Sequence, residues 1–325
     1  MKKLVLASIL LAMAVIVLGA YTRLTDAGLG CPDWPGCYGH LTVGQAAKNI
    51  EQAQQLYPER PFEAHKAWNE MVHRYFASAL GLCIVVIFVL SVMQRNYHRP
   101  LKLPFFLVCL VIFQGMLGMW TVTLNLLPVV VMGHLLGGFS VLCCLYLLYL
   151  RMTPYRIPGG DHRMRAYGKY ALTGIVIVTA QIALGGWTSA NYAALACTNL
   201  PLCEGQWLEN LDFAGAFSVP DAHNYEFGAH DYAERMTMHM THRAGAVLTF
   251  LYLSWLALRI YKAANAKLIK RLCALMMIVL GVQIILGVSN IVFSLPIVVA
   301  LLHNFVAVCL LLVMITLSYT LYRKT

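Results

Sequence analysis

Eight long apolar runs constrain the fold of this chain more than any other feature of its sequence. Each run is close to, or longer than, the roughly 18 residues that an α-helix needs to cross a bilayer. Because 60% of the 325 residues are hydrophobic and 12% are charged, the chain holds more apolar side chains than a soluble domain of this length can bury. The sequence therefore predicts an all-α integral membrane protein. Its transmembrane helices are expected at about residues 4–20, 74–93, 103–122, 127–150, 170–189, 241–258, 272–292 and 297–321.

The charged residues are distributed as membrane topology requires. The formal net charge is +10, and every acidic residue except Asp161 lies in or beside the loops on one side. The positive-inside rule places the basic loops and both termini in the cytoplasm, and the long segments 21–72 and 190–240 outside. The charge is thus explained without nucleic acid, and no such partner is expected. The basic residues that gather at the termini and in alternate loops include Lys2, Lys3, Arg95, Arg99, Arg156, Arg163, Lys267, Arg271, Arg323 and Lys324.

The sequence contains an internal duplication. Residues 19–39, GAYTRLTDAGLGCPDWPGCYG, align with residues 185–205, GGWTSANYAALACTNLPLCEG, at an offset of 166. Each copy holds an even number of spans, so both copies cross the membrane in the same orientation, unlike inverted repeats. At an offset of 169, three more matches link the copies: His73 with His242, Arg74 with Arg243, and His134 with His303.

This duplication predicts two tandem, same-orientation four-helix bundles. We expect an N-terminal bundle at residues 1–150, a cytoplasmic linker at 151–169 and a C-terminal bundle at 170–325. Small residues and bundle-core side chains would pack the helices together.

Four histidines lie within the spans or at their outer ends. A polar side chain in a bilayer costs free energy, so an intramembrane histidine is a candidate functional residue. His134 and His303 lie about seven residues into their runs, on the order of 10 Å below the outer mouth at roughly 1.5 Å per residue. His73 and His242 begin the second and sixth runs from the same side. Two histidines from facing helices of each bundle are able to clamp a haem iron.

Two other interpretations of the histidines stay open. Zinc is less favoured, because structural zinc takes four ligands and catalytic zinc takes three. Hydrogen bonding between helices would explain a single histidine better than two pairs repeated at one offset. Gln114 and Gln283, which are also 169 residues apart, predict a hydrogen-bond network between helices near the pairs.

One position distinguishes the two copies chemically. Glu70 in the first copy is replaced by His239 in the second, one helical turn before the first histidine and on nearly the same face. A carboxylate there is suited to general acid or base catalysis, or to stabilising positive charge on a substrate. The alternative is a structural ion pair with Arg74 or Lys66. Arg74 and its counterpart Arg243 lie toward the aqueous boundary, where a guanidinium matches a haem propionate.

Each long outer segment carries two cysteines spaced by six residues, in CPDWPGC and CTNLPLC. The prolines favour compact turns, and the outer compartment permits disulfides. Structural disulfides, a redox role that passes reducing equivalents, and free thiols all stay open. The residues are Cys31, Cys37, Cys197 and Cys203.

Together, the motifs TRLTDAGLGCPDWPGCYG, EMVHR, QGMLG…H and HMTHR…QIILG…LH resemble the heme A synthase family across essentially the whole chain. The resemblance implies an enzyme of the bacterial inner membrane that oxidises the C8 methyl group of haem O to the formyl group of haem A. It implies haem O synthase as the substrate donor, cytochrome oxidase assembly as the product acceptor, an unidentified electron donor and a surrounding lipid bilayer. It maps the cysteine pair of some bacterial members onto Cys31 and Cys37.

The resemblance also assigns roles to the repeated residues. The substrate haem O would bind in the N-terminal half, near the periplasmic side, at His73 and His134 with Arg74, and Glu70 would be the essential acid. A haem b cofactor would bind in the C-terminal half at His242 and His303, with Arg243 nearby.

Two alternatives compete with the enzyme. A membrane di-haem b-type electron carrier predicts two equivalent sites and gives no reason for Glu70 to differ from His239. A haem transporter predicts a path between leaflets, whereas all four histidines come to one side. In the enzyme, two histidine ligands leave no open position on the substrate iron, so either one ligand dissociates or oxygen does not bind that iron. The role of segment 204–238 stays open.

Overall fold

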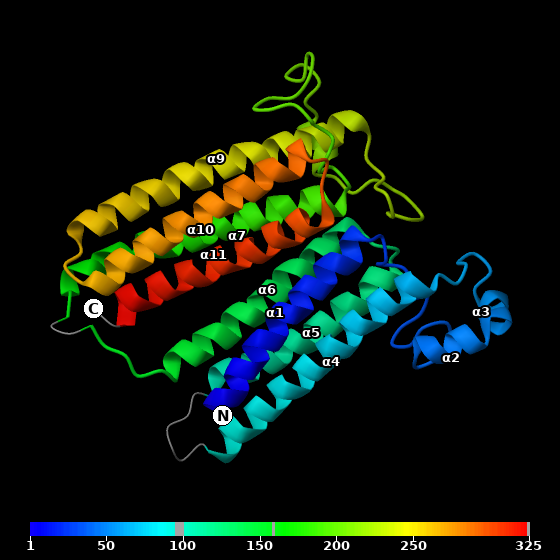
Figure 1. Cartoon of the computed structure of the whole chain (residues 1–325), viewed down its shortest axis with the longest axis horizontal. Helices are drawn as coiled ribbons and strands as arrows, with labels where there is room; N and C mark the ends of the chain where they lie inside the picture. Colours follow the sequence, from blue (N-terminus) through cyan, green and yellow to red (C-terminus); the bar gives the residue numbers. More distant parts are fainter. Residues whose placement is uncertain (95–100, 158–159, 324–325) are drawn as a thin grey trace. The chain divides into compact units, whose positions relative to one another are not determined.

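The computed structural model describes residues 1–94, 101–157 and 160–323 (Figure 1). These residues form helices and loops and contain no β-strand, apart from one isolated bridge between Cys37 and His40. Arg95, Arg99 and Lys324, which contributed to the predicted topology, lie outside the described residues.

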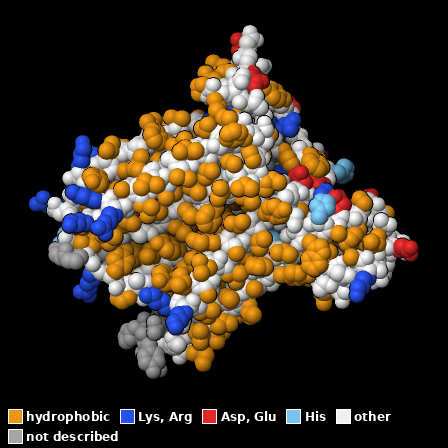
Figure 2. Space-filling model, in the orientation of Figure 1, with side chains coloured by type: hydrophobic (Ala, Val, Ile, Leu, Met, Phe, Trp, Pro, Cys, Tyr) orange, Lys and Arg blue, Asp and Glu red, His pale blue; other side chains and the backbone are white. Residues whose placement is uncertain are grey.

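Eight helices of the described chain are long and apolar enough to cross a membrane, with 18-residue windows of mean hydropathy between 1.4 and 2.7. In a bilayer a helix forms over such a run because it satisfies its backbone N–H and C=O groups internally. Hydrophobic side chains cover much of the face that Figure 2 shows. Leu82 and Leu248, for example, are each 66% exposed. The predicted all-α membrane fold is confirmed. The helices are α1 (Lys2–Leu24), α4 (Ala64–Met93), α5 (Lys102–Thr123), α6 (Pro128–Arg151), α7 (Gly168–Ala190, preceded by the 3-10 turn His162–Tyr167), α9 (Tyr232–Ala263), α10 (Lys267–Val292) and α11 (Ile297–Arg323).

The chain divides into two compact units. The first unit contains Met1–Leu148 and Val219–Ala229, and the second contains Tyr149–Ser218 and the chain from His230 onward. In the first unit α1 packs against α4 and α4 packs against α5, while α6 places its histidine against α5. In the second unit α7 packs against α9, α9 against α10, α10 against α11, and α11 back against α7, which closes a four-helix ring.

The duplication extends to the backbone of the turns that join α5 to α6 and α10 to α11. Asn125 and Leu126 have φ of 49° and 62°, and Ser294 and Leu295, 169 residues later, have φ of 54° and 62°. In both turns the amide of the second residue donates to the carbonyl oxygen five residues earlier, at 2.8 and 2.7 Å. Positive φ is uncommon for residues other than glycine, so its recurrence at one offset shows that the halves share one local structure.

The long outer loop of the first unit folds onto the start of α4. It contains the short helices α2 (Val43–Lys48) and α3 (Ile50–Leu56). The Thr42 side chain caps α2 by accepting a hydrogen bond from the Gln45 amide. The buried core of the loop joins α4 through Met71, so the loop covers the outer end of the helix that carries the first histidine. This core comprises Cys31, Cys37, Tyr38, Val43, Ala46, Ala53, Ala67 and Met71.

Part of the second outer loop is built into the first unit. Residues 219–229 are grouped with that unit, and Tyr225 packs in one buried cluster with Leu126. The Tyr225 amide donates to the carbonyl oxygen of Asn125 at 3.0 Å, and the Asn125 side chain donates back to the segment at 2.9 Å. The segment 204–238, whose role the sequence left open, therefore includes a strap over the α5–α6 turn.

Candidate functional site

The first unit brings His73 of α4 and His134 of α6 together. Their ring centroids lie 6.3 Å apart, and the ring planes are inclined by 85°. A metal–imidazole bond is about 2 Å long and the ring centre lies about 1 Å behind its nitrogen, so two rings on opposite sides of one metal have centroids roughly 6 Å apart. The observed separation matches that arrangement.

Each of the four histidines lies against a glycine of a neighbouring helix. A Cβ atom at any of these glycines would come close to the Cε1 atom of the imidazole, and at two of them closer than 3.0 Å. Because interiors are close-packed, the missing side chain of each glycine leaves a slot that the imidazole ring occupies. These slots recur at matching positions in the two units. The pairs and their Cβ–Cε1 distances are Gly19–His73 (2.8 Å), Gly118–His134 (3.4 Å), Gly185–His242 (2.9 Å) and Gly287–His303 (3.1 Å).

The number of histidines in each unit fits a haem iron better than a zinc ion. The rings of His73, His134 and His303 interact with the backbone of Val15, Gln114 and Gln283. No side chain in the described chain hydrogen-bonds their Nδ1 atoms. Groups of three or more metal-binding side chains do not occur among the described residues, so the histidines do not meet the ligand number of a zinc site. Pairs of half-buried imidazoles do meet the number that one haem iron takes.

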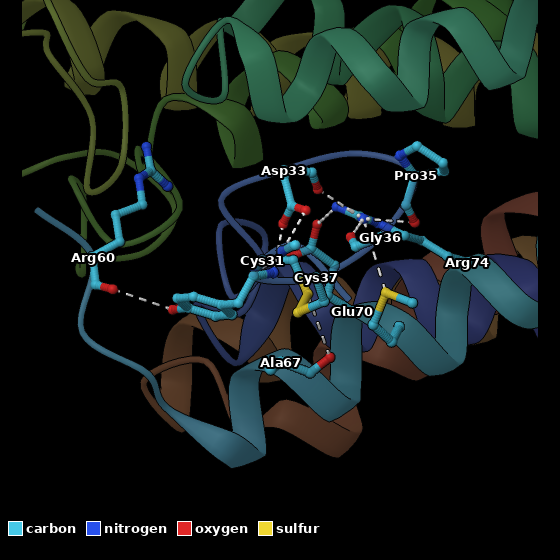
Figure 3. Close-up of a disulfide and its surroundings, with 12 residues drawn as sticks. Cys31, Asp33, Pro35, Gly36, Cys37, Arg60, Ala67, Glu70 and Arg74 are labelled. Carbon is cyan, nitrogen blue, oxygen red and sulfur yellow. Dashed lines mark hydrogen bonds and ion pairs between the residues drawn. A yellow bond between two sulfur atoms is a disulfide. The ribbon is translucent and has the colours of Figure 1, made fainter. Parts of the chain in front are cut away.

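Glu70 is buried, with 5% of its surface exposed, and it turns toward the first disulfide loop (Figure 3). One carboxylate oxygen accepts a hydrogen bond from the backbone amide of Cys31 at 2.8 Å, and the other accepts one from the guanidinium of Arg74. Of the two predicted ion-pair partners, Arg74 is therefore the one that Glu70 contacts. Lys66 instead pairs with Glu63, at 2.9 Å.

Arg74 and Arg243 make equivalent contacts in the two units. Arg74 Nη1 donates to the carbonyl oxygens of Gly36 at 2.6 Å and of Asp33 at 3.0 Å (Figure 3), and Asp33 aligns with Asn199 of the second copy. Arg243 donates to the carbonyl oxygens of Cys197 at 2.6 Å and Asn199 at 2.7 Å. The structure thus brings both guanidinium groups, which we expected beside haem propionates, onto the carbonyl groups of the cysteine loops.

Both predicted cysteine pairs form disulfides. The Cα atoms of Cys31 and Cys37 lie 4.8 Å apart, and those of Cys197 and Cys203 lie 5.2 Å apart. Each disulfide closes the loop that the arginine of the same unit contacts. In each unit, the disulfide and the arginine together hold the cysteine loop over the start of the helix that carries the arginine, which is α4 in the first unit and α9 in the second.

His239 occupies the position of Glu70 in the second unit. Its side chain is buried, and its Nδ1 atom has no hydrogen-bond partner in the described part of the chain. The second cysteine loop is therefore held by Arg243 without a carboxylate at this position. The predicted asymmetry between the two units thus extends to how each loop is attached.

Two glutamines of the second unit contact its histidines. The amide nitrogen of Gln181 lies 3.0 Å from Nδ1 of His242 and donates to the His242 carbonyl oxygen at 3.0 Å. The amide nitrogen of Gln283 lies 3.3 Å from Nε2 of His303. Sequence reasoning anticipated Gln283 but missed Gln181. A polar residue in the middle of an apolar run was the signal that could have identified it.

A polar cavity of about 530 Å³ lies between the first outer loop and the strap of residues 219–229. Arg60 donates to the side-chain oxygen of Asn125 at 2.6 Å beside it. The buried phenol of Tyr38 donates to a loop carbonyl at 3.0 Å, and burial raises the pKa of Tyr38 above its ordinary value, so the phenol stays a donor. The other lining residues include Glu59, Glu63, Lys66, His223 and Glu226.

These features define a multi-pass helical membrane protein with a repeated pair of half-buried histidines. A profile of the COX15-CtaA family, described as a cytochrome oxidase assembly protein, matches residues 2–315. A heme A synthase of Shewanella oneidensis is 48% identical over 320 residues, which cover 98% of this chain and 96% of that protein. A heme A synthase of Neorickettsia sennetsu is 26% identical over 93% of this chain and 93% of that protein. A heme A synthase of Nitrosospira multiformis is 25% identical over 97% of this chain and 91% of that protein.

The chain belongs to the COX15-CtaA family, and within it to the heme A synthase family. The resemblance predicted from the sequence motifs is therefore confirmed.

Proposed function

We propose that this chain is a heme A synthase, an oxidoreductase that converts haem O to haem A by oxidising the C8 methyl group to a formyl group. The observation that carries the proposal is the half-buried histidine pair, with ring centroids 6.3 Å apart, in a chain that is 48% identical to a heme A synthase. The equivalent glycine slots of the second unit support a second haem.

The N-terminal bundle, residues 1–150, is proposed to bind haem O as substrate. His73 and His134 would bind its iron, and the close packing of the two rings against Gly19 and Gly118 restricts their orientation. Arg74 keeps the cysteine loop closed beside the site, so a propionate would share its donors with the loop carbonyls.

Glu70 is proposed as the catalytic carboxylate of the N-terminal site. It is buried one turn before His73, and the other half has a histidine in its place. Its two oxygens are held by Arg74 and by the amide of Cys31. To accept or deliver a proton at the substrate, Glu70 must release one of these partners when haem O binds.

The C-terminal bundle, residues 170–325, is proposed to hold haem b at His242 and His303, with Arg243 closing the loop above. Haem b, when bound there, supplies one-electron transfer between the unidentified donor and the substrate site. Gln181 and Gln283 contact these two imidazoles. Residues 151–169 would form the cytoplasmic linker.

The helices and the distribution of charge also indicate where in the cell the protein lies. The eight apolar helices fit a multi-pass membrane protein, and we propose the bacterial inner membrane, with both termini cytoplasmic and the haem sites near the periplasmic side. Haem O synthase would supply the substrate, and cytochrome oxidase assembly would receive the product. The positions of the two disulfides in the outer loops support this orientation.

The direct test uses a host that makes haem O but not haem A. The chain is expressed there, the haems are extracted, and the extract is separated by chromatography. Haem A should appear with the intact chain and disappear with His73→Ala. The control His65→Ala changes a histidine in the first turn of α4 whose side chain is 70% exposed, and it should leave the product unchanged. An unchanged haem profile with the intact, folded chain would favour the di-haem electron carrier.

A further inference from the structure

The second unit holds one of its histidines in a way that the first does not. The amide nitrogen of Gln181, on α7, lies 3.0 Å from Nδ1 of His242. The position aligned with Gln181 in the first copy is Val15, which has no polar side-chain atom. No side chain in the described structure hydrogen-bonds Nδ1 of the equivalent His73, whose ring interacts instead with the backbone of Val15.

A second difference makes room for this contact. A Cβ atom on Gly245 would lie 2.2 Å from Oε1 of Gln181, so a larger residue there would displace the amide. The position aligned with Gly245 in the first copy is Phe76. The second copy thus has a glutamine and a glycine at the two positions where the first copy has a valine and a phenylalanine.

The hydrogen-bonding capacity of Gln181 suits a histidine that binds iron. If Nε2 of His242 is the ligand atom, Nδ1 carries the proton and needs an acceptor. The Oε1 atom of Gln181 is buried and has no partner among the described residues, and it belongs to the amide that already lies at Nδ1. Rotation of the amide brings this acceptor onto Nδ1–H, in exchange for the hydrogen bond that the amide nitrogen donates to the His242 carbonyl oxygen. Such a bond fixes the ring orientation and raises the basicity of the ligand nitrogen.

We propose that Gln181 is a positioning residue for His242 that secures the resident haem of the C-terminal half, a side-chain restraint that the N-terminal half lacks. The inference rests on the proposed function. It explains how the C-terminal half retains its haem as a cofactor while the N-terminal half releases its haem as product, although each half provides two histidines. In the first unit, the nearest comparable glutamine, Gln114, has a buried amide nitrogen with no partner within the described residues.

The test compares three variants of the full chain purified in detergent. Gln181→Met keeps the length of the side chain and removes both hydrogen-bonding atoms. Gln181→Glu keeps an acceptor for Nδ1–H. Val15→Met makes the matched change at the aligned position of the first unit. For each, haem b per polypeptide, the rate of haem transfer to apomyoglobin and the haem midpoint potential are measured.

We expect Gln181→Met to release haem b roughly tenfold faster or more, the usual cost of losing such a partner. Gln181→Glu should retain haem b and lower its midpoint potential, because a carboxylate makes the imidazole a stronger donor. Val15→Met should retain haem b like the intact chain. Wild-type retention and potential in Gln181→Met would overturn the inference and leave packing as the only role. Haem b absent from the intact chain would instead overturn the proposed function.

Discussion

Glu70 accepts a hydrogen bond from Arg74, one turn further along α4, and Arg74 in turn donates to the carbonyl oxygen of Gly36 at 2.6 Å (Figure 3). The other oxygen of Glu70 accepts from the amide of Cys31, at the start of the disulfide loop. The proposed catalytic carboxylate and the loop above the site are therefore parts of one hydrogen-bonded unit. Any change that frees the carboxylate also loosens the loop.

Glu70→Gln should abolish catalysis while the loop stays in place. The neutral amide still offers an oxygen to the Cys31 amide, but it loses the acid–base function, which is worth about 10²- to 10⁴-fold in rate. Haem A formed per unit of protein should fall by about 100-fold or more, as measured by chromatography of extracted haems. Glu63→Gln, which alters a 43%-exposed acid that pairs with Lys66, is the control. Normal haem A production by Glu70→Gln would remove Glu70 from the catalytic role.

Arg74→Ala should destabilise the protein more than Arg243→Ala, although both arginines hold equivalent loops. Removing Arg74 leaves the buried carboxylate of Glu70 without its cation, which costs about 3–5 kcal/mol. Removing Arg243 loses hydrogen bonds to carbonyl groups only, at about 1–3 kcal/mol. Unfolding in detergent measures the free energies, and limited proteolysis shows which cysteine loop opens. Equal losses for the two variants would contradict the ion pair of Glu70.

Gly185→Ala should lower the haem b content of the purified protein. The added Cβ atom would lie 2.9 Å from Cε1 of His242, so the imidazole must leave its slot. The pyridine haemochrome spectrum measures haem b per polypeptide. Gly281→Ala is the matched control, because a Cβ atom there meets no atom within 4 Å in the described structure. A full haem b complement in Gly185→Ala would show that the slot does not position a ligand.

Asn125→Gly should release the strap of residues 219–229. Glycine retains the left-handed backbone, with φ of 49° at this position. The substitution removes the bonds from the Arg60 guanidinium at 2.6 Å and to the strap carbonyl at 2.9 Å. We expect a loss of about 1–3 kcal/mol and faster proteolysis within 219–229. Ser294→Gly, at the aligned turn, should leave this cleavage rate unchanged. Equal protection of the strap in both variants would show that other contacts hold it.

Much of this protein could be predicted from local sequence. The apolar runs predicted the eight helices, because their length and hydrophobicity alone suffice for a membrane span. The repeat offsets predicted that the two halves duplicate one four-helix unit, and the matching turns at Asn125 and Ser294 agree with that duplication. The spacing of six residues in compact loops made disulfides one of the expected states of the outer cysteines, and both disulfides form. Each of these features is determined by residues close together in the sequence or by the internal repeat.

What the sequence by itself determined is the set of spans, their duplication and the identity of the four histidines. The tertiary structure decided where the side chains between helices point. Arg74 contacts loop carbonyls, Gln181 contacts His242, and residues 219–229 join the first unit. The physical reason is that these contacts join segments tens of residues apart, and several side chains of similar chemistry could have made each of them. Packing selects the partner, and periodicity along the chain carries no information about that choice.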